Sequence, residues 1–362
     1  MATGNRGRGP LVADKRYTTS RSTGSGGGGG PKKPAPPKSP KAPRKRTRAA
    51  RPARRHGLVI GLIAAIWRVL WGIAWRATAI GALILGGIVW YFYTQLPEVA
   101  DLIDGRARGS VTMLDRNGEV FAWRGETFGG MITAASVSPA LHDAVVATED
   151  KRFYWHFGIS PRGIASAIRI NLSEGRGALE GNGGSTITQQ TAKLLCLGVE
   201  WNPKDWKSEA DYEKDCRQGG IWRKIKEVPF AMAMEAKYSK EEILTIYFNR
   251  AYLGAGARGF EAAAQRYFGK SAKDVSTAEA AMLAGLLKAP STYAPTASME
   301  RARNRAALVI GLMEEAGYLT KAEADEARAN PAVLSNAAKQ RSGGYFADWV
   351  METTPDQLAR HT

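Results

Sequence analysis

The sequence predicts a mainly α-helical protein: one membrane-spanning helix followed by a helical domain with a small β-hairpin. Three observations carry this prediction. An uncharged segment covers 77–96, helix-capping sequences recur from Ser138 onward, and an alternating apolar and polar stretch surrounds Arg116-Asn117-Gly118. Apolar positions follow the caps at three- and four-residue spacing, which is the period of helices that cover a core.

The membrane-spanning helix is predicted at 77–96, where the chain has no charged side chain for 20 residues. About 20 apolar residues are needed to cross the roughly 30 Å of hydrocarbon in a bilayer. The preceding segment, 57–76, is apolar but is broken by Arg68 and Arg76. We therefore expect an interfacial amphipathic helix there rather than a second span. Three tryptophans at four-residue steps share one face of that helix: Trp67, Trp71 and Trp75.

Residues 1–56 form a basic tail that holds most of the net charge of +17. Its roughly sixteen lysines and arginines are accompanied by one acidic residue, Asp14, and the remainder of the chain is near neutral. The tail has almost no large apolar side chains, so we predict that it is disordered. A basic flank before a span places the tail in the cytoplasm and everything after about Leu96 outside. The tail then faces anionic lipid headgroups or cytoplasmic partners. Although a polybasic segment binds any polyanion, nucleic acid is not an expected partner.

After the span, a juxtamembrane segment over 97–137 is expected to contain the β-hairpin. From Ser138 the pattern becomes helical, and 138–325 is predicted to be the main helical domain, with 326–362 as a linker. Helix starts are marked by serine before proline and by capping boxes. They are Ser138-Pro139, Ser160-Pro161, Ser239–Glu242, Ser276–Glu279 and Thr320–Glu323.

Two long loops are expected within the helical domain, at 173–184 and 194–221. Loops of this length without structure usually act as lids or binding edges. The second loop holds both cysteines, Cys196 and Cys216, which lack the spacing of a zinc site. They can pair in an oxidising compartment, but the sequence does not give their separation in space. A disulfide and two free thiols therefore both stay open.

An acidic pair, Glu149-Asp150, ends the helix predicted to begin at Pro139. Such a pair usually belongs to a solvated face. A carboxylate at the negative end of a helix dipole tends, however, to have a raised pKa, which suits a base that works near neutral pH. His156 follows closely, and we interpret it as a core histidine with satisfied hydrogen bonds rather than as a catalytic group.

A second candidate motif, GGSTITQQ, runs from Gly183 to Gln190, with Lys193 one turn further on. Two glycines and hydroxyl residues at a helix start are expected to leave backbone N–H groups free and facing outward, which suits a diphosphate. The order of residues excludes a Walker A loop. A capped helix after a flexible loop is the simpler interpretation of this motif taken alone.

A third motif, RKIKE, places Arg223 and Glu227 four residues apart, and therefore on one helix face. This spacing is compatible with a surface ion pair. The alternative is a second carboxylate that faces a phosphate-binding base, but the ion pair is the simpler interpretation of this motif taken alone.

The strings ATEDKRFYWHFG, GGSTITQQTAK, RKIKE and KEEILTIYFNRAYLGAGARGFEAAAQRYFGK follow one another after a single span. Over about 139–319 they resemble the family 51 glycosyltransferase domain of class A penicillin-binding proteins. The resemblance implies a lysozyme-like helical domain with a small membrane-dipping lobe. It implies a peptidoglycan glycosyltransferase that polymerises lipid II and releases undecaprenyl diphosphate.

By the same resemblance, Glu149 is the general base that deprotonates the acceptor GlcNAc 4-hydroxyl for attack on C1 of the donor MurNAc, and Glu227 is a second essential carboxylate. The groups that would hold the donor sugar and diphosphate are Ser185, Thr186, Gln189, Gln190, Lys193, Arg223 and Lys224. Asp150 and Asn249 are included as substrate-binding candidates, although the motifs around them favour structural roles. A divalent cation, Mg or Mn, at the diphosphate is left open, because the three cationic side chains could serve instead.

The resemblance also implies a single-pass protein of the bacterial inner membrane, with a cytoplasmic amino terminus and a periplasmic catalytic domain. The expected partners are lipid II, the growing glycan strand, the membrane, and cell-wall synthesis or division proteins.

The sequence departs from the family in two places. Leu194 replaces the usual Asn after the lysine of the second motif, and the connection to Arg223 is longer than usual, with Arg217 as the nearest candidate for an arginine that the family places there. No Ser is followed three residues later by Lys, so no transpeptidase activity is expected. Residues 343–349 resemble the linker to a transpeptidase domain. We favour a truncated class A protein over a monofunctional enzyme.

Two other functions compete with polymerisation. A lytic transglycosylase or lysozyme-like hydrolase would share the fold and a catalytic Glu, but would not need the diphosphate-type motif around Lys193. An inactive membrane scaffold would need neither Glu149 nor Glu227.

Overall fold

The computed structural model describes residues 56–103 and 111–339, apart from 115, 117, 119, 125–126, 129, 179–183, 200 and 218–219. The basic tail before His56, and the part of the predicted linker after Lys339, lie outside the described residues. The chain divides into two compact units, Met1–Ala65 and Ile66–Thr362. The helical domain belongs to the second unit.

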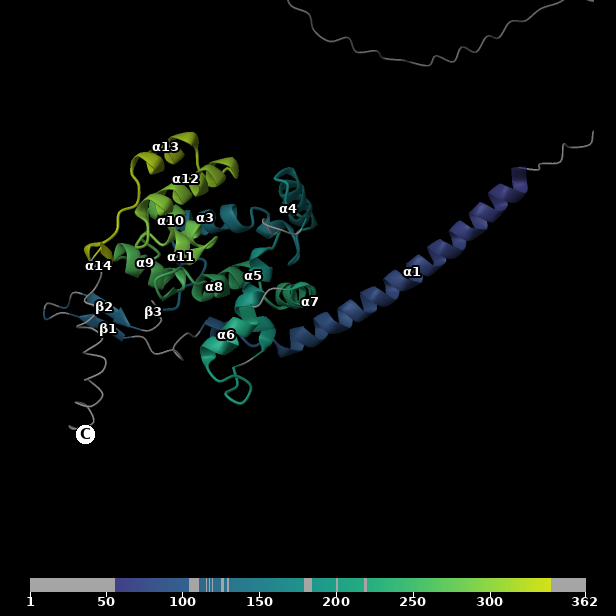
Figure 1. Ribbon diagram of the computed structural model, residues 1–362, viewed down its shortest axis with the longest axis horizontal. Coiled ribbons are helices and arrows are strands. Elements are labelled where there is room, and N and C mark those ends of the chain that lie inside the picture. Colours follow the sequence, from purple (N-terminus) through teal and green to yellow (C-terminus); the bar gives the residue numbers. More distant parts are fainter. Residues whose placement is uncertain are drawn as a thin grey trace, which may run out of the picture. The chain divides into compact units, whose positions relative to one another are not determined.

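A single helix, α1 (His56–Gln95), covers both the predicted interfacial helix and the predicted span (Figure 1). The two predicted segments form one continuous helix with no break at Arg76, and the polar side chains there bond to carbonyls of their own helix. The Arg76 guanidinium donates to the Gly72 carbonyl at 3.2 Å, and the Thr78 hydroxyl donates to the Ala74 carbonyl at 2.8 Å. The stretch Ile60–Gln95 is long and apolar enough to cross a membrane.

The domain that follows is mainly helical, which confirms the predicted fold class. Its larger half is built around α10 (Thr277–Leu286), which is buried at almost every position. The small side chains of α10 allow α3 (Pro139–Glu149) and α12 (Met299–Glu315) to pack closely on it (Figure 1). Three neighbouring helices complete this half: α9 (Phe260–Phe268), α11 (Pro290–Tyr293) and α13 (Lys321–Ala329).

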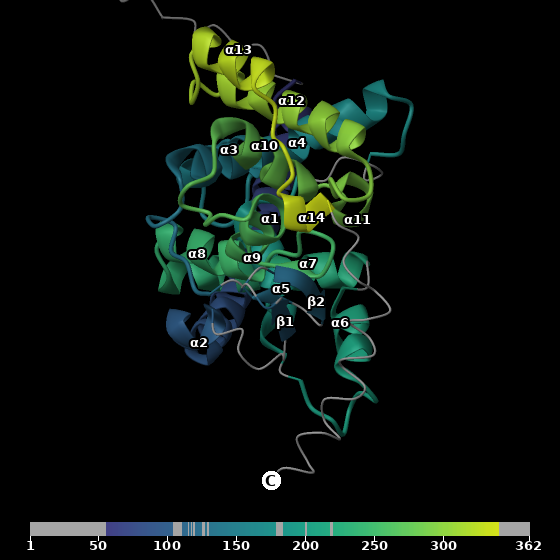
Figure 2. The same cartoon turned by 90° about the vertical axis from the view of Figure 1, so that its left-hand side faces the viewer.

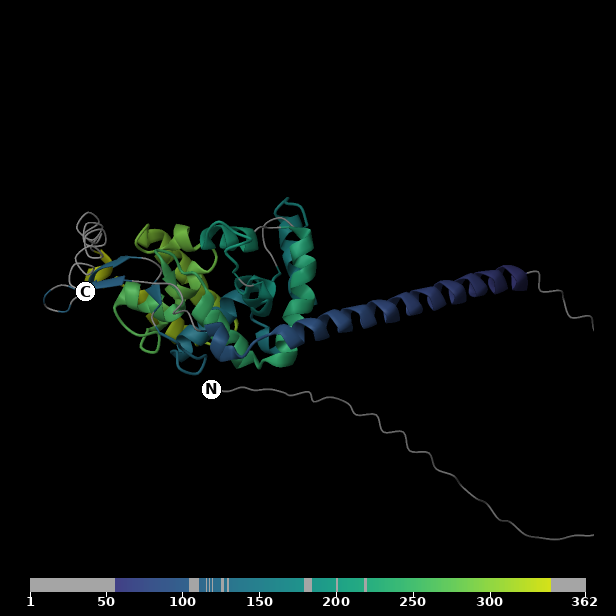
Figure 3. The ribbon, with the colours of Figure 1, turned by 90° about the horizontal axis from the view of Figure 1, so that it is seen from below.

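The second half is built around α5 (Ile187–Leu194), which packs against α7 (Ile221–Lys237) and α8 (Lys240–Arg250). The end of α1 contacts α7, as the view from below shows (Figure 3). Phe92 packs edge-on against Phe230 with 5.2 Å between ring centroids. The Tyr238 hydroxyl donates to the Pro97 carbonyl at 2.5 Å, and Lys237 donates to the Leu96 carbonyl. α2 (Val99–Ile103) then leads toward the hairpin.

The five capped helix starts that the sequence predicts are confirmed. Ser138 and Ser160 cap α3 and α4 (Pro161–Ser173), and complete capping boxes start α8, α10 and α13. A fourth capping box, between Thr186 and Gln189, starts α5. Caps are local interactions, which is why a single sequence suffices to find them.

The predicted β-hairpin is confirmed. β1 (Val111–Leu114) pairs antiparallel with β2 (Val120–Arg124), with an irregularity at Met113 and Leu114 (Figure 2). A second short pair was not predicted: β3 (Thr127–Phe128) lies parallel to β4 (Ala257–Arg258). The remaining short elements are η1 (Phe153–Trp155), η2 (Cys196–Gly198), α6 (Glu209–Arg217) and α14 (Asn336–Lys339).

The expected long loop at 194–221 is therefore partly structured, since it contains η2 and α6. Its two cysteines are joined: Cys196 and Cys216 form a disulfide, with 5.2 Å between their Cα atoms. This resolves the choice that the sequence left open. A sequence separation of 20 does not fix a distance, whereas α6 turns the chain back toward the end of α5.

Candidate active site

Glu149 lies at the last position of α3, because the backbone of Asp150 leaves the helical region. The Gln190 side-chain amide, on α5, donates to Glu149 Oε2 at 2.7 Å. The Tyr247 hydroxyl, on α8, donates in turn to Gln190 Oε1 at 3.1 Å. Three helices thus hold one carboxylate in a defined orientation.

Burial raises the pKa of Glu149 above that of an ordinary carboxyl. The hydrogen bond from Gln190 and the positive charges of Arg305 and Lys288 act in the opposite direction, and the neighbouring Asp150 adds to the rise. The raised pKa predicted from the helix dipole is therefore present, but desolvation is its main cause. A base is most effective when its pKa lies near the working pH, so this environment suits proton abstraction.

Gln190→Ala should raise the pKa of Glu149 further, because the ionised carboxylate loses its amide donor. A hydrogen bond to a charged group contributes about 1.5 kcal/mol or more, which corresponds to roughly one pKa unit. The acidic limb of the pH–rate profile is expected to move up by about one pH unit. Tyr247→Phe is the matched control: it removes only the donor to Gln190, so its shift should be smaller. An unmoved profile in Gln190→Ala would contradict this role of the amide.

Asp150 makes structural contacts through one carboxylate oxygen, which favours a structural role over the substrate-binding role for which it was a candidate. Its Oδ2 atom accepts hydrogen bonds from His156 Nε2 at 2.8 Å and from the Ile187 backbone N–H at 3.2 Å. The Asp150 and His156 side chains are 7% and 8% exposed. His156 is a buried core side chain, as predicted, but its hydrogen bonds are not all satisfied: Nε2 contacts Asp150, whereas the buried Nδ1 atom has no hydrogen-bond partner among the described residues. The pair ties the turn after α3 to the start of α5.

The start of α5 also differs from the prediction. We expected free outward N–H groups, but the N–H groups of Thr186, Ile187 and Gln189 all have protein partners. Thr186 N–H donates to Gln189 Oε1, and Gln189 N–H donates to Thr186 Oγ1, each at 3.1 Å. The Thr186 hydroxyl donates to the Gly158 carbonyl at 2.7 Å. Thr186 and Gln189 are buried, so they position the helix rather than contact the donor.

The glycine before this helix start permits a very close backbone contact. A Cβ atom on Gly184 would lie 2.6 Å from Ile164 Cα and 2.7 Å from the Gly163 carbonyl carbon. Both atoms belong to the backbone of α4, so they cannot rotate away. The absence of a side chain at Gly184 therefore sets how close Ser185 lies to α4.

Gly184→Ala is consequently expected to destabilise the domain by about 1–3 kcal/mol, as overpacking does elsewhere. The substitution should also displace Ser185 and lower activity. Thermal unfolding and polymerisation assays measure the two effects. Gly86→Ala is the matched control, because a Cβ atom there meets nothing within 4 Å. Equal behaviour of the two variants would show that the contact with α4 has no consequence.

Glu227 is buried, at 1% exposure, so the motif around it is not a surface ion pair. Its Oε1 atom lies 2.9 Å from Arg223 Nε, and its Oε2 atom lies 2.7 Å from Lys224 Nζ. The Lys224 ammonium also donates to Ser185 Oγ at 2.6 Å. One carboxylate on α7 thus orients two cations and, through Lys224, the serine that precedes α5.

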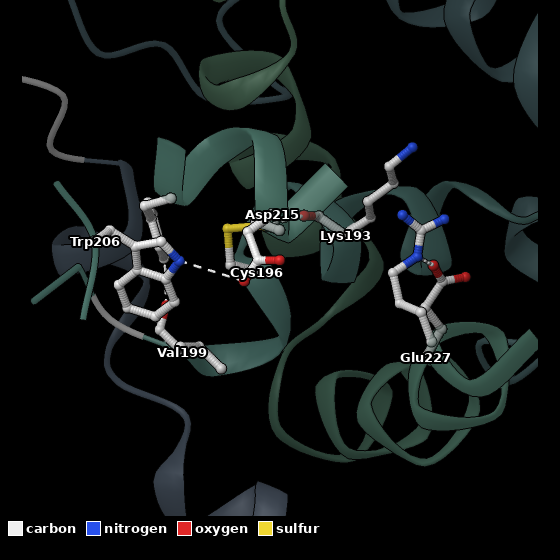
Figure 4. The surroundings of a disulfide bond; sticks show 9 residues. Lys193, Cys196, Val199, Trp206, Asp215 and Glu227 are labelled. Carbon is white, nitrogen blue, oxygen red and sulfur yellow. Dashed lines mark hydrogen bonds and ion pairs between the residues drawn. A yellow bond between two sulfur atoms is a disulfide. The ribbon is translucent and has the colours of Figure 1, made fainter. Parts of the chain in front are cut away.

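A surface pocket of about 380 Å³ opens beside these cations. Lys193 at the end of α5 and Arg223 and Lys226 on α7 line it, together with Trp222, Asp215 and the disulfide. Figure 4 shows the Lys193 side chain directed toward the side on which Glu227 lies. Three cationic side chains against one exposed carboxylate make this pocket suited to a multiply charged anion.

Asn249 contacts neither Glu149 nor the cationic pocket, which corrects its place among the binding candidates. Its Oδ1 atom accepts from the Ile132 N–H at 3.1 Å, and its amide nitrogen donates to the Ile132 and Thr245 carbonyls, each at 2.7 Å. All of its polar atoms are therefore used to hold the segment before α3 on α8. The partner Ile132 lies 117 residues away in sequence, so no local pattern indicates this role.

Several contributing residues were missed from the sequence. Buried Glu235 accepts from the Thr188 hydroxyl at 2.5 Å and from the Lys240 ammonium at 2.7 Å. Lys240 also donates to the His156 carbonyl at 2.8 Å and lies 4.5 Å from the centroid of the Phe153 ring. This network joins α5, α7 and α8 beneath the site. Lys240 and Tyr247 occur in the KEEILTIYFN string, whereas Arg305 lies outside every motif.

The sequence pattern of the transglycosylase family matches residues 117–314, which is more than half of the chain and includes Glu149, the pocket and Glu227. The chain belongs to the transglycosylase family. The candidate site therefore lies inside the transglycosylase domain.

Several similar proteins are called penicillin-binding protein 1A. The protein from Vibrio cholerae is 36% identical over 286 residues, which are 77% of this chain and 32% of the relative. That from Escherichia coli is 38% identical over 249 residues, 69% of this chain and 27% of the relative. That from Aquifex aeolicus is 36% identical over 271 residues, which are 74% of this chain and 34% of the relative. This transglycosylase chain thus spans about a third of the length of these relatives.

Among solved structures, the transglycosylase resembles the crystal structure of penicillin-binding protein 1A from Haemophilus influenzae. The alignment has a TM-score of 0.38 and 23% identity, and it covers 70% of this chain and 24% of that chain.

Proposed function

We propose that this chain polymerises lipid II into glycan strands, with Glu149 as the general base and the pocket at Lys193 as the site of the donor diphosphate. One observation carries the proposal. Gln190, which holds Glu149, and Lys193, which lines the pocket, are three residues apart on α5. Residues at this spacing share a helix face, so the base and the anion pocket are arranged along one side of α5.

In this mechanism Glu149 accepts the proton of the acceptor 4-hydroxyl as its oxygen attacks C1 of the donor MurNAc. The bond from C1 to the diphosphate oxygen breaks, and undecaprenyl diphosphate leaves with the bonding electron pair. Lys193, Arg223 and Lys224 bind the negative charge that develops on the diphosphate, which lowers the barrier. Glu227 orients Arg223 and Lys224, and Ser185 is held within reach by Lys224.

The residues present do not form a site for Mg or Mn held by the protein. Within the described part of the chain, no three acidic, His or Cys side chains cluster as metal ligands. The pocket is lined by three cationic side chains and by Asp215. The nearby Glu227 is already paired with Arg223 and Lys224. Hard divalent cations require several oxygen ligands, so we derive no step through a metal.

The proposal extends to location. α1 is long and apolar enough to span a membrane once, and the basic residues before it favour a cytoplasmic amino terminus. The catalytic domain would then lie on the periplasmic side of the bacterial inner membrane. There it would contact the membrane, lipid II and the growing strand, and be accessible to cell-wall synthesis or division proteins.

The test is polymerisation of lipid II by the full chain in detergent, with the glycan products resolved on a gel. The expected result is long strands, together with no degradation of finished cell-wall sacculi. Degradation of sacculi would support a lytic enzyme instead. Bound lipid II without any product would support a scaffold and overturn the proposal.

A further inference from the structure

The connection between α5 and α7, residues 195–220, is closed by the Cys196–Cys216 disulfide. Cys196 lies two residues after the end of α5 at Leu194, and Cys216 lies five residues before the start of α7 at Ile221. The disulfide therefore joins the ends of two helices through short segments. These are the two helices that supply the cations of the pocket.

The two walls of the pocket carry like charges at the ends of helices that pack on each other further along. Lys193 belongs to the last turn of α5, while Arg223 and Lys226 belong to the first two turns of α7. Like charges on two separate helices favour an open pocket when no anion is bound. Glu227 offsets Arg223, and Asp215 is the one carboxylate among the residues that line the pocket.

The connection is also packed internally. The Tyr212 hydroxyl donates to the Val199 carbonyl at 2.5 Å, and Trp206 Nε1 donates to Asp215 Oδ2 at 3.3 Å (Figure 4). The rings of Trp201, Trp206 and Tyr212 contact one another, with centroids 5.1 to 6.4 Å apart. α6 packs mainly on η2, which belongs to the same connection. The covalent bond between Cys196 and Cys216 is therefore a main attachment of α6, and of Asp215, to the pocket.

We propose that the Cys196–Cys216 disulfide is a positioning element for the diphosphate pocket, which holds the cation-bearing ends of α5 and α7 together before the donor arrives. The inference rests on the proposed function for the identity of the anion. A dithiol reductant would transfer two electrons and two protons to the bond, giving two thiols and an oxidised dithiol. The pocket would then open and donor affinity would fall, while Glu149 and its hydrogen bond to Gln190 on α5 would remain.

The experiment compares the oxidised full chain, the same protein after dithiothreitol, and the C196S/C216S variant, in detergent. Kinetics with lipid II give KM and kcat, calorimetry with farnesyl diphosphate gives affinity for a prenyl diphosphate, and circular dichroism gives helix content. We expect reduction to raise KM and the dissociation constant of farnesyl diphosphate about tenfold. A tenfold rise corresponds to a closed pocket in about one reduced molecule out of ten. The value of kcat should change less than about twofold. The C196S/C216S variant should match the reduced protein and should not respond to dithiothreitol.

Unchanged KM and unchanged farnesyl diphosphate affinity after reduction would overturn the inference while polymerisation, and thus the proposed function, stands. A fall in kcat with unchanged KM would overturn it too, since the link would then act on the chemical step. Loss of helix content in both the reduced protein and the variant would show a role in folding rather than in positioning. If the oxidised protein does not polymerise lipid II, the proposed function fails, and the calorimetry still decides whether the disulfide sets anion affinity.

Discussion

Glu149→Gln is expected to lower the rate of lipid II polymerisation by about 10²- to 10⁴-fold, the usual contribution of a general base. Gln keeps the size of the side chain and can still contact Gln190, but it cannot accept the proton of the acceptor hydroxyl. Single-turnover kinetics should show the loss in the chemical step, with the binding of lipid II retained. A variant that still makes long strands at the wild-type rate would remove Glu149 from the mechanism.

The same substitution should stabilise the fold at neutral pH, which separates its effect on catalysis from damage to the structure. Burial raises the pKa of Glu149, so the folded state favours the protonated form. The stability that this form contributes is present below the unfolded pKa and is lost as pH rises through the folded pKa. Melting temperatures of wild type and Glu149→Gln are therefore expected to agree at acidic pH and to diverge in favour of the variant as pH increases. A lower melting temperature for the variant at neutral pH would contradict burial as the main cause.

Glu227→Gln is expected to lower polymerisation by about 10²-fold, the scale seen when one electrostatic group of a catalytic site is removed. A neutral amide cannot hold both Arg223 and Lys224, so the two cations repel each other and leave the donor diphosphate poorly bound. Breaking a fully buried pair costs about 3–5 kcal/mol. A smaller loss of stability is expected here, because the Arg223 and Lys224 side chains are 21% and 47% exposed.

Glu279→Gln is the matched control for this substitution. Glu279 is also a largely buried glutamate, which accepts from Lys270 Nζ at 3.1 Å and from the Ser276 N–H at 2.8 Å. It lies at the start of α10, outside the proposed site, so its variant should lose stability but keep the rate per folded molecule. Equal loss of activity in the two variants would mean that Glu227 acts through the fold alone.

The proposed site shows where sequence reasoning succeeds and where it stops. The structure places the motifs of Glu149, Lys193 and Glu227 on α3, α5 and α7, and the catalytic and binding roles of these residues stay a prediction. Asp150 and Asn249 belong to the same family motifs, yet Asp150 Oδ2 and the side-chain amide of Asn249 are bonded within the protein. A motif indicates that a residue type is needed at a position. It does not indicate whether that residue binds a substrate or stabilises the fold.

The sequence by itself determined the features that depend on neighbours within about one helical turn. These are the caps at Ser138, Ser160 and Ser239, the end of α3 at Glu149, and the apolar length of α1. The tertiary structure decided what depends on segments distant in sequence. It brought Gln190 to Glu149 across 41 residues and closed the disulfide across 20. It also occupied the N–H groups at the start of α5 that the sequence had suggested were free. Local hydrogen bonds and hydrophobic spacing depend on short stretches of the chain. Desolvation of side chains and long-range pairing arise only once the helices have packed.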